Sequence, residues 1–241
     1  MSRPKIVIFT GSGISAESGI PTYRGTEGLW ANYDRAYLAS IRGWRDDPRL
    51  VLDFYNARRT SMSAAVPNEA HLAIAALEQS YNVVVITQNI DNLHEQAGST
   101  NVLHLHGQID WARGSDTSEY RQHIGAQPIT FGRLCPEGTQ LRPDVVWFGE
   151  MPKHFDEARL HFKTAAKVLV VGTSLAVQPA AGLLSKARGG ADKRLIDTVW
   201  SKPPYGYRIS VGLATVAVPR ICNTWLDDAA ANARQTAQDL P

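Results

Sequence analysis

Near its N-terminus the chain reads Ile6-Val7-Ile8-Phe9-Thr10-Gly11-Ser12-Gly13-Ile14-Ser15-Ala16-Glu17-Ser18-Gly19-Ile20-Pro21. Its first four residues form an apolar, β-branched run that is typical of a buried parallel strand. The glycines that follow let the backbone approach a phosphate closely, and N–H groups at a helix start can hold that phosphate. Ala16 replaces the third glycine of the dinucleotide-binding pattern G-x-G-x-x-G. A phosphate-binding turn and a tight turn without any ligand are therefore both open for this segment.

Two more apolar runs, at residues 83–86 and 168–171, have the same character. The ranges 68–79 and 155–166, which precede these runs, carry apolar residues at helical spacing. This alternation predicts an α/β protein with a Rossmann-like, doubly wound parallel sheet that binds its ligand at the carboxyl ends of the strands. A final strand and helix are expected around residues 214–226.

Two insertions interrupt the alternation, and we expect them to form a smaller second lobe. The length of 241 residues fits a single catalytic domain over residues 1–241. The expected lobes are a large Rossmann-like lobe at about 1–30, 67–109 and 143–241 and a small lobe at about 31–66 and 110–142.

Composition argues against a nucleic-acid-binding, a secreted disulfide-rich or a membrane protein. The 25 Lys and Arg against 23 Asp and Glu leave a net charge of +2, too little for a general nucleic-acid binder. Two cysteines, Cys135 and Cys222, are too few for a disulfide-stapled secreted fold. The apolar run at 6–9 is too short for a signal or membrane segment. We expect a cytoplasmic protein with no nucleic-acid or membrane partner.

Polar residues follow the second and third runs. Gln88-Asn89-Ile90-Asp91 offers amides and a carboxylate that can bind hydroxyls and a carboxamide, although Asn89 or Asp91 can also cap the next helix. Both roles are compatible. Gly172-Thr173-Ser174 is a second candidate phosphate or ribose contact, and its hydroxyl pair can equally be a helix N-cap.

The segment Val102-Leu103-His104-Leu105-His106-Gly107 places two histidines on one face of a strand, unless the strand ends between them. Histidine titrates near neutral pH and can remove a proton from a ribose hydroxyl, whereas a lone histidine is more often a packed, hydrogen-bonded residue. Gly107 favours His106 as the base, because it places His106 at the strand terminus.

Five motifs in order resemble the sirtuin family over about residues 5–190. They are Gly11 to Arg24, Gln88-Asn89-Ile90-Asp91, His106-Gly107, Arg142-Pro143-Asp144-Val145-Val146-Trp147-Phe148-Gly149-Glu150 and Gly172-Thr173-Ser174. The resemblance implies an NAD-dependent deacylase that acts on acylated lysine side chains of proteins. It also implies that nicotinamide is released and that the acyl group passes to ADP-ribose.

The resemblance also implies roles for individual residues. His106 becomes the general base, with Asn89 and Asp91 flanking the nicotinamide as further catalytic residues. Val145, Val146 and Phe148 would bind the peptide by strand addition. The implied NAD-binding residues are Gly11, Ser12, Gly13, Ile14, Ser15, Ala16, Glu17, Ser18, Gly19, Ile20, Arg24, Gln88, Asn89, Ile90, Asp91, Gly172, Thr173, Ser174 and Ala214.

Residues Phe54-Tyr55-Asn56-Ala57-Arg58-Arg59 resemble the segment in which class III sirtuins place a Tyr and an Arg three residues apart. On a helix, Tyr55 and Arg58 share a face. They can then bind a distal carboxylate, which predicts desuccinylase or demalonylase activity beside deacetylase activity. The alternative is a core tyrosine next to a solvated arginine.

The chain departs from the family pattern in three places. Between His106-Gly107 and Arg142 it holds only Cys135, where most sirtuins have two C-x-x-C pairs, so we predict no zinc and a small lobe packed through Trp111, Tyr120 and Phe131. Ser12 and Tyr23 replace the usual Ala and Phe. Asp197 stands where the family has an asparagine at the adenosine-binding strand end.

Two other functions fit parts of the sequence. An NAD-dependent protein ADP-ribosyltransferase or an NAD hydrolase on the same fold would share the cleavage of the glycosidic bond. A non-enzymatic nucleotide-binding module is a third possibility, because a fold does not fix a function. The presence of Asn89, Asp91 and His106 together favours deacylation.

Overall fold

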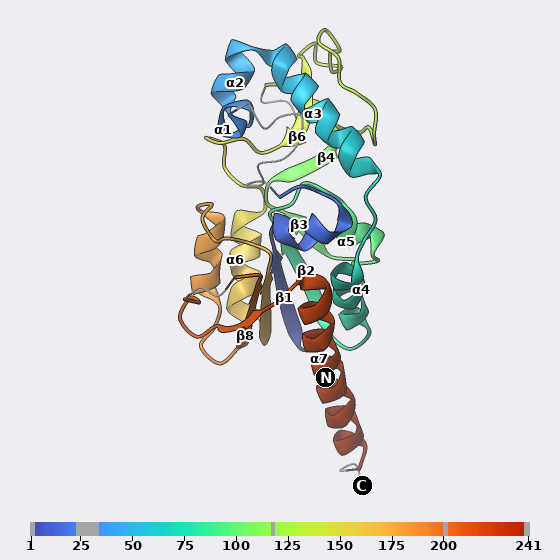
Figure 1. Ribbon diagram of the computed structural model, residues 1–241, viewed down its shortest axis with the longest axis vertical. Helices are drawn as coiled ribbons and strands as arrows, with labels where there is room; N and C mark the ends of the chain where they lie inside the picture. The colour runs from blue at the N-terminus through green and yellow to red at the C-terminus, as the bar shows by residue number, and fades with distance from the viewer. Residues whose placement is uncertain (1–2, 23–33, 117–118, 200–201, 239–241) are drawn as a thin grey trace.

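The computed structural model describes residues 3–22, 34–116, 119–199 and 202–238 (Figure 1). Its main sheet has six parallel strands in the order β3-β2-β1-β7-β8-β9. Counted along the chain within this sheet, that order is 3-2-1-4-5-6, the order of a Rossmann fold. The expected fold class is confirmed. The strands are β1 (Lys5–Thr10), β2 (Asn82–Thr87), β3 (Val102–His104), β7 (Lys167–Val171), β8 (Asp192–Asp197) and β9 (Arg208–Val211).

Helices cover both faces of this sheet. On one face, α4 (Glu69–Ala76), η2 (Leu77–Gln79) and α7 (Ala214–Gln238) bury an apolar cluster that includes Ile6, Ile8 and Trp225. On the other face, α6 (Phe155–Thr164) and η3 (Ala180–Lys186) pack on Val7 and Phe9. Residues that alternate along β1 therefore fill two separate cores, which explains its unbroken apolar pattern.

The three apolar runs and the two helical ranges lie where the sequence predicts them. The prediction of a strand within 214–226 is wrong, because this range is helical throughout and the strand β9 precedes it. Ala214, Val218, Cys222 and Trp225 are buried at helical spacing in α7. Strand β9 has the mixed sequence Arg-Ile-Ser-Val at the edge of the sheet, so it lacks the apolar signal of the inner strands.

A second sheet lies at the other end of the molecule (Figure 1). It is antiparallel, in the order β5-β4-β6. We use the name small lobe for this sheet together with helices α1 to α3. The elements are β4 (Gly107–Gly114), β5 (Arg121–His123), β6 (Leu141–Val145), α1 (Arg35–Leu38), α2 (Ile41–Asp46) and α3 (Pro48–Ser63).

The core of the small lobe differs from the predicted one. Leu52, Ala112, Ile124, Ile129, Cys135 and Leu141 form a buried cluster, and Tyr120 packs against it from the side. Phe131 is 48% exposed beneath the Arg49 guanidinium. Trp111 contacts Arg121 and His123 instead, because neighbouring residues of a strand point to opposite faces and Ala112 takes the inner one. Trp111 and Phe131 are therefore wrong as core residues.

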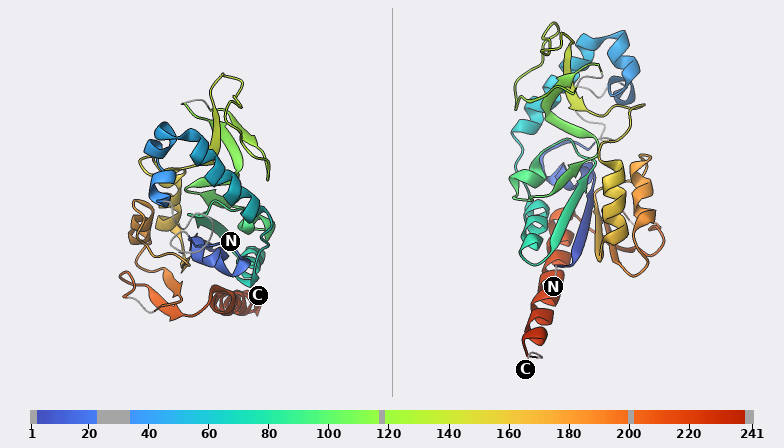
Figure 2. Two further views of the ribbon diagram at one scale, coloured as in Figure 1. Left: turned by 45° about the horizontal axis from the view of Figure 1, so that its top comes forward. Right: turned by 180° about the vertical axis from the view of Figure 1, so that it is seen from behind.

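The C-terminal part of α7 extends beyond the end of the main sheet (Figure 2). No helix in the described ranges has the length and apolar character needed to cross a lipid bilayer. Within the same ranges, no three His, Cys, Asp or Glu side chains are grouped so that they could hold a metal ion.

Candidate active site

A cavity of about 420 Å³ lies between the carboxyl ends of the main-sheet strands and the small lobe. This volume is within the range of roughly 300–1,000 Å³ that is usual for small-molecule sites. Its walls come from the turns after β1, β2, β7 and β8, from α3 and from the segment after β6. The cavity therefore lies at the point where the strand order of the sheet reverses, between β1 and β7.

The turns after β1 and β7 cross each other at the floor of the cavity. The Gly13 amide donates to the Gly172 carbonyl oxygen at 2.8 Å. A Cβ on Gly13 would lie 2.7 Å from the Gly172 Cα, and a Cβ on Gly172, at φ +64°, would lie 2.3 Å from the Ile14 nitrogen. Only glycine allows this approach. The crossing and the short helix η1 (Ser12–Ser18) form a backbone cradle that suits a pyrophosphate.

Ser15, Asn89 and Asp91 form a hydrogen-bonded cluster beside this cradle. The Ser15 hydroxyl donates to Asp91 Oδ2 at 3.0 Å, and Asn89 Nδ2 donates to Ser15 Oγ at 3.1 Å. Asp91 Oδ1 also accepts the amide of Leu93, the first residue of α5 (Leu93–Gln96), at 3.2 Å. One Asp91 oxygen thus accepts a hydrogen bond from the start of α5, and the other binds Ser15 within the cluster. Burial raises the pKa of Asp91, and the hydrogen bonds from Leu93 and Ser15 oppose that rise.

The structure separates the two histidines because β3 ends at His104. The ring of His106 lies in the turn beyond the strand and lines the cavity. Its Nδ1 lies 3.0 Å from the Gln88 carbonyl oxygen, which can only accept, so Nδ1 carries the proton and Nε2 is the basic nitrogen. Burial lowers the pKa of His106, which keeps the ring neutral at physiological pH.

Thr173 Oγ1 accepts two hydrogen bonds, one of them from Gln88, whose carbonyl contacts His106. Gln88 Nε2 donates to Thr173 Oγ1 at 2.9 Å and thereby connects the turns after β2 and β7. Thr173 Oγ1 also accepts the Leu175 amide at 3.3 Å, whereas the next helix, η3, begins at Ala180. The hydroxyl pair is therefore no helix N-cap.

Tyr55 and Arg58 both line the cavity from α3. Tyr55 is 3% exposed, and its hydroxyl accepts a hydrogen bond from Trp147 Nε1 at 3.1 Å. Arg58 is half-buried, with its guanidinium 5.5 Å from the Phe54 ring centroid. Tyr55 is thus a core tyrosine, and Arg58 lines the cavity rather than standing free in solvent.

The segment after β6 forms a further part of the cavity wall, next to α3, and its backbone is already hydrogen-bonded. The Val146 amide donates to the His106 carbonyl at 2.9 Å, and the Phe148 amide donates to the Ala39 carbonyl at 2.8 Å. A peptide added as a strand would have to use other backbone groups of this segment. Val145, Val146 and Phe148 do line the cavity, so their contact with a peptide stays a prediction.

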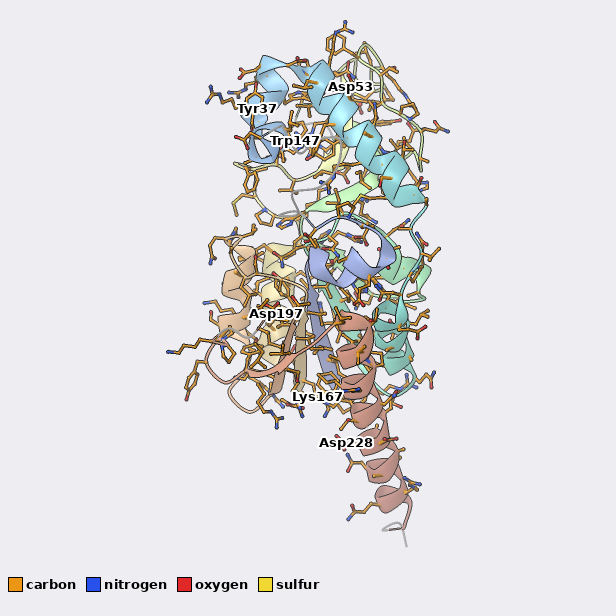
Figure 3. The ribbon with its side chains drawn as sticks, viewed as in Figure 1. Tyr37, Asp53, Trp147, Lys167, Asp197 and Asp228 are labelled. Carbon is orange, nitrogen blue, oxygen red and sulfur yellow. The ribbon has the colours of Figure 1, made fainter. Side chains whose placement is uncertain are left out.

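Sequence reasoning missed two features of this wall. Trp147 lies in the small lobe (Figure 3). It is 2% exposed, and the Arg142 guanidinium stacks on it, 3.3 Å from the ring centroid. Arg142 forms a two-pronged ion pair with Glu150, with distances of 2.8 and 2.9 Å. The opposite charges eight residues apart, around the apolar Val-Val-Trp-Phe run, are the signal that could have identified this pair.

Most of the predicted NAD-binding residues lie together. Gly11, Ser12, Gly13, Ile20, Gln88, Asn89, Ile90, Asp91, Gly172, Thr173, Ser174 and Ala214 line the cavity. Ile14, Ser15, Ala16, Glu17 and Ser18 belong to η1, and Gly19 caps it in the left-handed conformation at φ +85°. Arg24 and Tyr23 lie outside the described residues.

The family model described as Sir2 family matches residues 11–179. A relative from Helicobacter pylori named NAD-dependent protein deacylase is 46% identical over 186 residues, which cover 77% of this chain and 81% of the relative. A solved Sir2 homologue in complex with NAD has a TM-score of 0.83 and 35% identity, with 94% of this chain and 91% of that chain covered.

A second solved structure is a Sir2 mutant with a deacetylated p53 peptide and 3′-O-acetyl ADP-ribose, at a TM-score of 0.75 and 27% identity over 94% of each chain. The fold and the cavity thus define an enzyme that binds a dinucleotide where the strand order of a Rossmann-type sheet reverses. The chain belongs to the Sir2 family, a family of NAD-dependent protein deacylases.

Proposed function

We propose that this protein removes acyl groups from lysine side chains of other proteins and transfers them to the ADP-ribose part of NAD. One observation carries the proposal: His106, whose Nδ1 faces the Gln88 carbonyl, shares a cavity with Asn89, Asp91 and the crossed glycine turns, and Ser15 joins Asn89 to Asp91. NAD, when bound, supplies an electrophilic sugar carbon and a nicotinamide leaving group. The protein has to position these groups, exclude water and move one proton.

The cradle fits the dinucleotide. The close packing of the turns at Gly13 and Gly172 brings the start of η1 to the carboxyl ends of β1 and β7, where a pyrophosphate would meet main-chain N–H groups of a helix start. Asn89 and Asp91 would bind the nicotinamide carboxamide through their amide and carboxylate groups. The Ser15 hydroxyl that joins these two side chains fixes their orientation before a ligand arrives.

His106 would act as the general base. Its Nδ1 proton is committed to the Gln88 carbonyl, which leaves Nε2 to accept a proton from a ribose hydroxyl. The amide oxygen of acyl-lysine would replace nicotinamide on the sugar carbon, and the deprotonated hydroxyl would then attack the acyl carbon. The C–N bond would break to release the lysine amine, and one water would supply the oxygen of the transferred acyl group. Overall, one acyl-lysine, one NAD and one water give lysine, nicotinamide and O-acyl-ADP-ribose.

The acyl pocket would accept short dicarboxylic acyl groups as well as acetyl. Tyr55 and Arg58 line the cavity from α3, and a guanidinium can bind the distal carboxylate of succinyl- or malonyl-lysine with two parallel hydrogen bonds. The fixed Tyr55 hydroxyl, held by Trp147, is placed at the same wall. We therefore expect activity on succinyl- or malonyl-lysine beside activity on acetyl-lysine.

Asp197 would bind the adenosine half. It lies at the carboxyl end of β8 and lines the cavity together with Gly172 and Ala214 (Figure 3). A carboxylate at such a strand end can accept hydrogen bonds from the ribose hydroxyls of an adenosine. A long hydrogen bond of 3.4 Å from the Val199 amide to Oδ1 orients the side chain. Asp197, which replaces the asparagine of the family, would therefore keep the contact with the ribose but make it through a charged acceptor.

A product assay tests the function. With NAD and an acetyl- or succinyl-lysine peptide, we expect one nicotinamide and one O-acyl-ADP-ribose for each lysine freed. ADP-ribose attached to protein would favour an ADP-ribosyltransferase, and nicotinamide released without peptide would favour an NAD hydrolase. Either result as the main outcome would contradict the proposal. His123→Gln, on the exposed strand β5, is the matched control for histidine variants in the site.

A further inference from the structure

His104 is a buried histidine behind the cavity, and the mechanism above gives it no role. It is the last residue of β3, its side chain is 6% exposed, and it is absent from the cavity lining. Nδ1 lies 2.9 Å from the carbonyl oxygen of Asn89, and Nε2 lies 2.8 Å from Glu95 Oε1. The ring therefore joins three elements: β3, the loop after β2 and the helix α5.

Both partners of the ring are hydrogen-bond acceptors. A backbone carbonyl has no proton to donate, and a carboxylate oxygen such as Glu95 Oε1 has none either. Two acceptors require two N–H donors, and only the imidazolium ion has two. The geometry thus assigns a positive charge to His104.

The charged groups around His104 agree with this assignment. Burial disfavours the charge, whereas the hydrogen bond and the charge of Glu95, the Asn89 carbonyl and the Asp91 carboxylate favour it. The net effect raises the pKa of His104 above its ordinary value. The other ring nearby, His94, is fully buried and has a pKa well below the ordinary value, so it stays neutral.

The cation stands directly behind the residues that would hold nicotinamide. His104 fixes the main-chain carbonyl of Asn89, while the side chain of Asn89 binds Ser15. Its positive charge also opposes the rise in the pKa of Asp91 that burial causes. An ionised Asp91 can accept the Ser15 hydroxyl and the Leu93 amide together, as the structure shows.

We infer that His104 is an imidazolium that, together with Glu95, acts as a positioning pair for Asn89 and Asp91 and so sets the affinity of the site for the nicotinamide end of NAD. The role of the pair in catalysis rests on the proposed function. The charge itself does not, because it follows from the two acceptors that the ring contacts.

Nitrogen-15 NMR of the ligand-free protein tests the charge. At about pH 7.5, above the ordinary histidine pKa of about 6.5, we expect both ring nitrogens of His104 to be protonated. Glu95→Gln keeps the size of the side chain and removes its charge, so the ring should titrate at lower pH in this variant. A neutral His104 ring at that pH in the unmodified protein would overturn the inference.

Kinetics tests the positioning role. In Glu95→Gln and in His104→Gln, kcat/KM for NAD should fall by about tenfold, as expected when a charge-assisted hydrogen bond is lost. The KM for the peptide should stay within about twofold, because neither residue lines the cavity. His123→Gln, which removes a similar but exposed histidine–carboxylate pair with Asp110, should change neither value.

A rise in the KM for the peptide as large as the fall in kcat/KM for NAD would mean that the pair is merely structural. That result would overturn the positioning role. Thermal unfolding of each variant identifies a folding defect, and Glu95→Gln is the variant to rely on if the buried substitution at His104 unfolds the protein. If the unmodified protein forms no O-acyl-ADP-ribose but His104 is charged, the proposed function fails while the assigned charge stands.

Discussion

At the scale of single residues, backbone partners set the protonation states on which the chemistry depends. The Gln88 carbonyl holds the Nδ1 proton of His106, and the Asn89 carbonyl holds that of His104. The two rings differ in the second partner, since His104 has the Glu95 carboxylate. One ring is therefore suited to be a neutral base, and the other to be a fixed cation.

The pH dependence of activity should reflect His106. Because burial lowers its pKa, the base stays neutral further into acid than an ordinary histidine, and protonation below that pKa removes activity. We expect the acidic limb of kcat/KM for NAD to have its midpoint below the ordinary value of 6.5. A midpoint at or above this value, measured with a peptide that does not titrate there, would contradict the assignment.

Arg58→Met tests the acyl pocket. The substitution keeps an unbranched, apolar stem beside Phe54 and removes the charge that would bind a distal carboxylate. We expect desuccinylation to fall by about tenfold or more and deacetylation to change by about twofold or less, as the loss of a two-pronged ion pair predicts. Arg49→Met, which removes an arginine stacked on Phe131 outside the cavity, is the matched control. Equal losses on both substrates would make Arg58 a structural residue.

Asp197→Asn tests the adenosine contact. A carboxylate repels the extra phosphate of 2′-phospho-ADP-ribose, whereas an amide does not. We expect the preference for ADP-ribose over its 2′-phosphate, measured by calorimetry, to shrink by about tenfold in the variant. Asp53→Asn, on the exposed side of α3, should leave it unchanged. An unaltered preference in Asp197→Asn would remove this residue from the site.

At the scale of elements, the sequence predicts buried strands well and the small lobe poorly. The inner strands β1, β2 and β7 are apolar on both faces, so composition alone reveals them. Strand β4, with the sequence Gly-Gln-Ile-Asp-Trp-Ala-Arg-Gly, has one face in the core and one outside, and its bulge breaks the alternation. Because a bulge interrupts the alternation, the sequence pattern does not reveal whether Trp111 or Ala112 points into the core of the small lobe.

The small lobe should need no zinc. Leu134 pairs with Gln140 in an isolated bridge, and the Cys135 amide donates to the Thr139 carbonyl at 2.8 Å, so hydrogen bonds close this turn. Cys135 itself lies buried in the core of the lobe. We expect a chelator to leave the melting temperature and the activity unchanged. One tightly bound zinc per chain in metal analysis would contradict this prediction.

At the scale of the whole molecule, the site joins segments that are far apart in the sequence. Ser15 meets Asp91 across 76 residues, and Trp147 meets Tyr55 across 92. The order of the motifs predicts that the glycine turns, Asn89, Asp91 and His106 share a site, because parallel strands bring their carboxyl ends together. The Trp147–Tyr55 contact and the division of roles between the two histidines depend on packing and on where β3 ends, which no local pattern reports.

The central claim is that one cavity binds NAD and that His106 completes the acyl transfer. It is tested most directly by comparing His106→Ala with the unmodified protein in two assays: NAD binding by calorimetry and O-acyl-ADP-ribose formation by mass spectrometry. We predict that binding is retained within about tenfold, because His106 is only one of many cavity residues, while the acyl product falls by at least about a hundredfold. Undiminished formation of the acyl product in the variant would contradict the account.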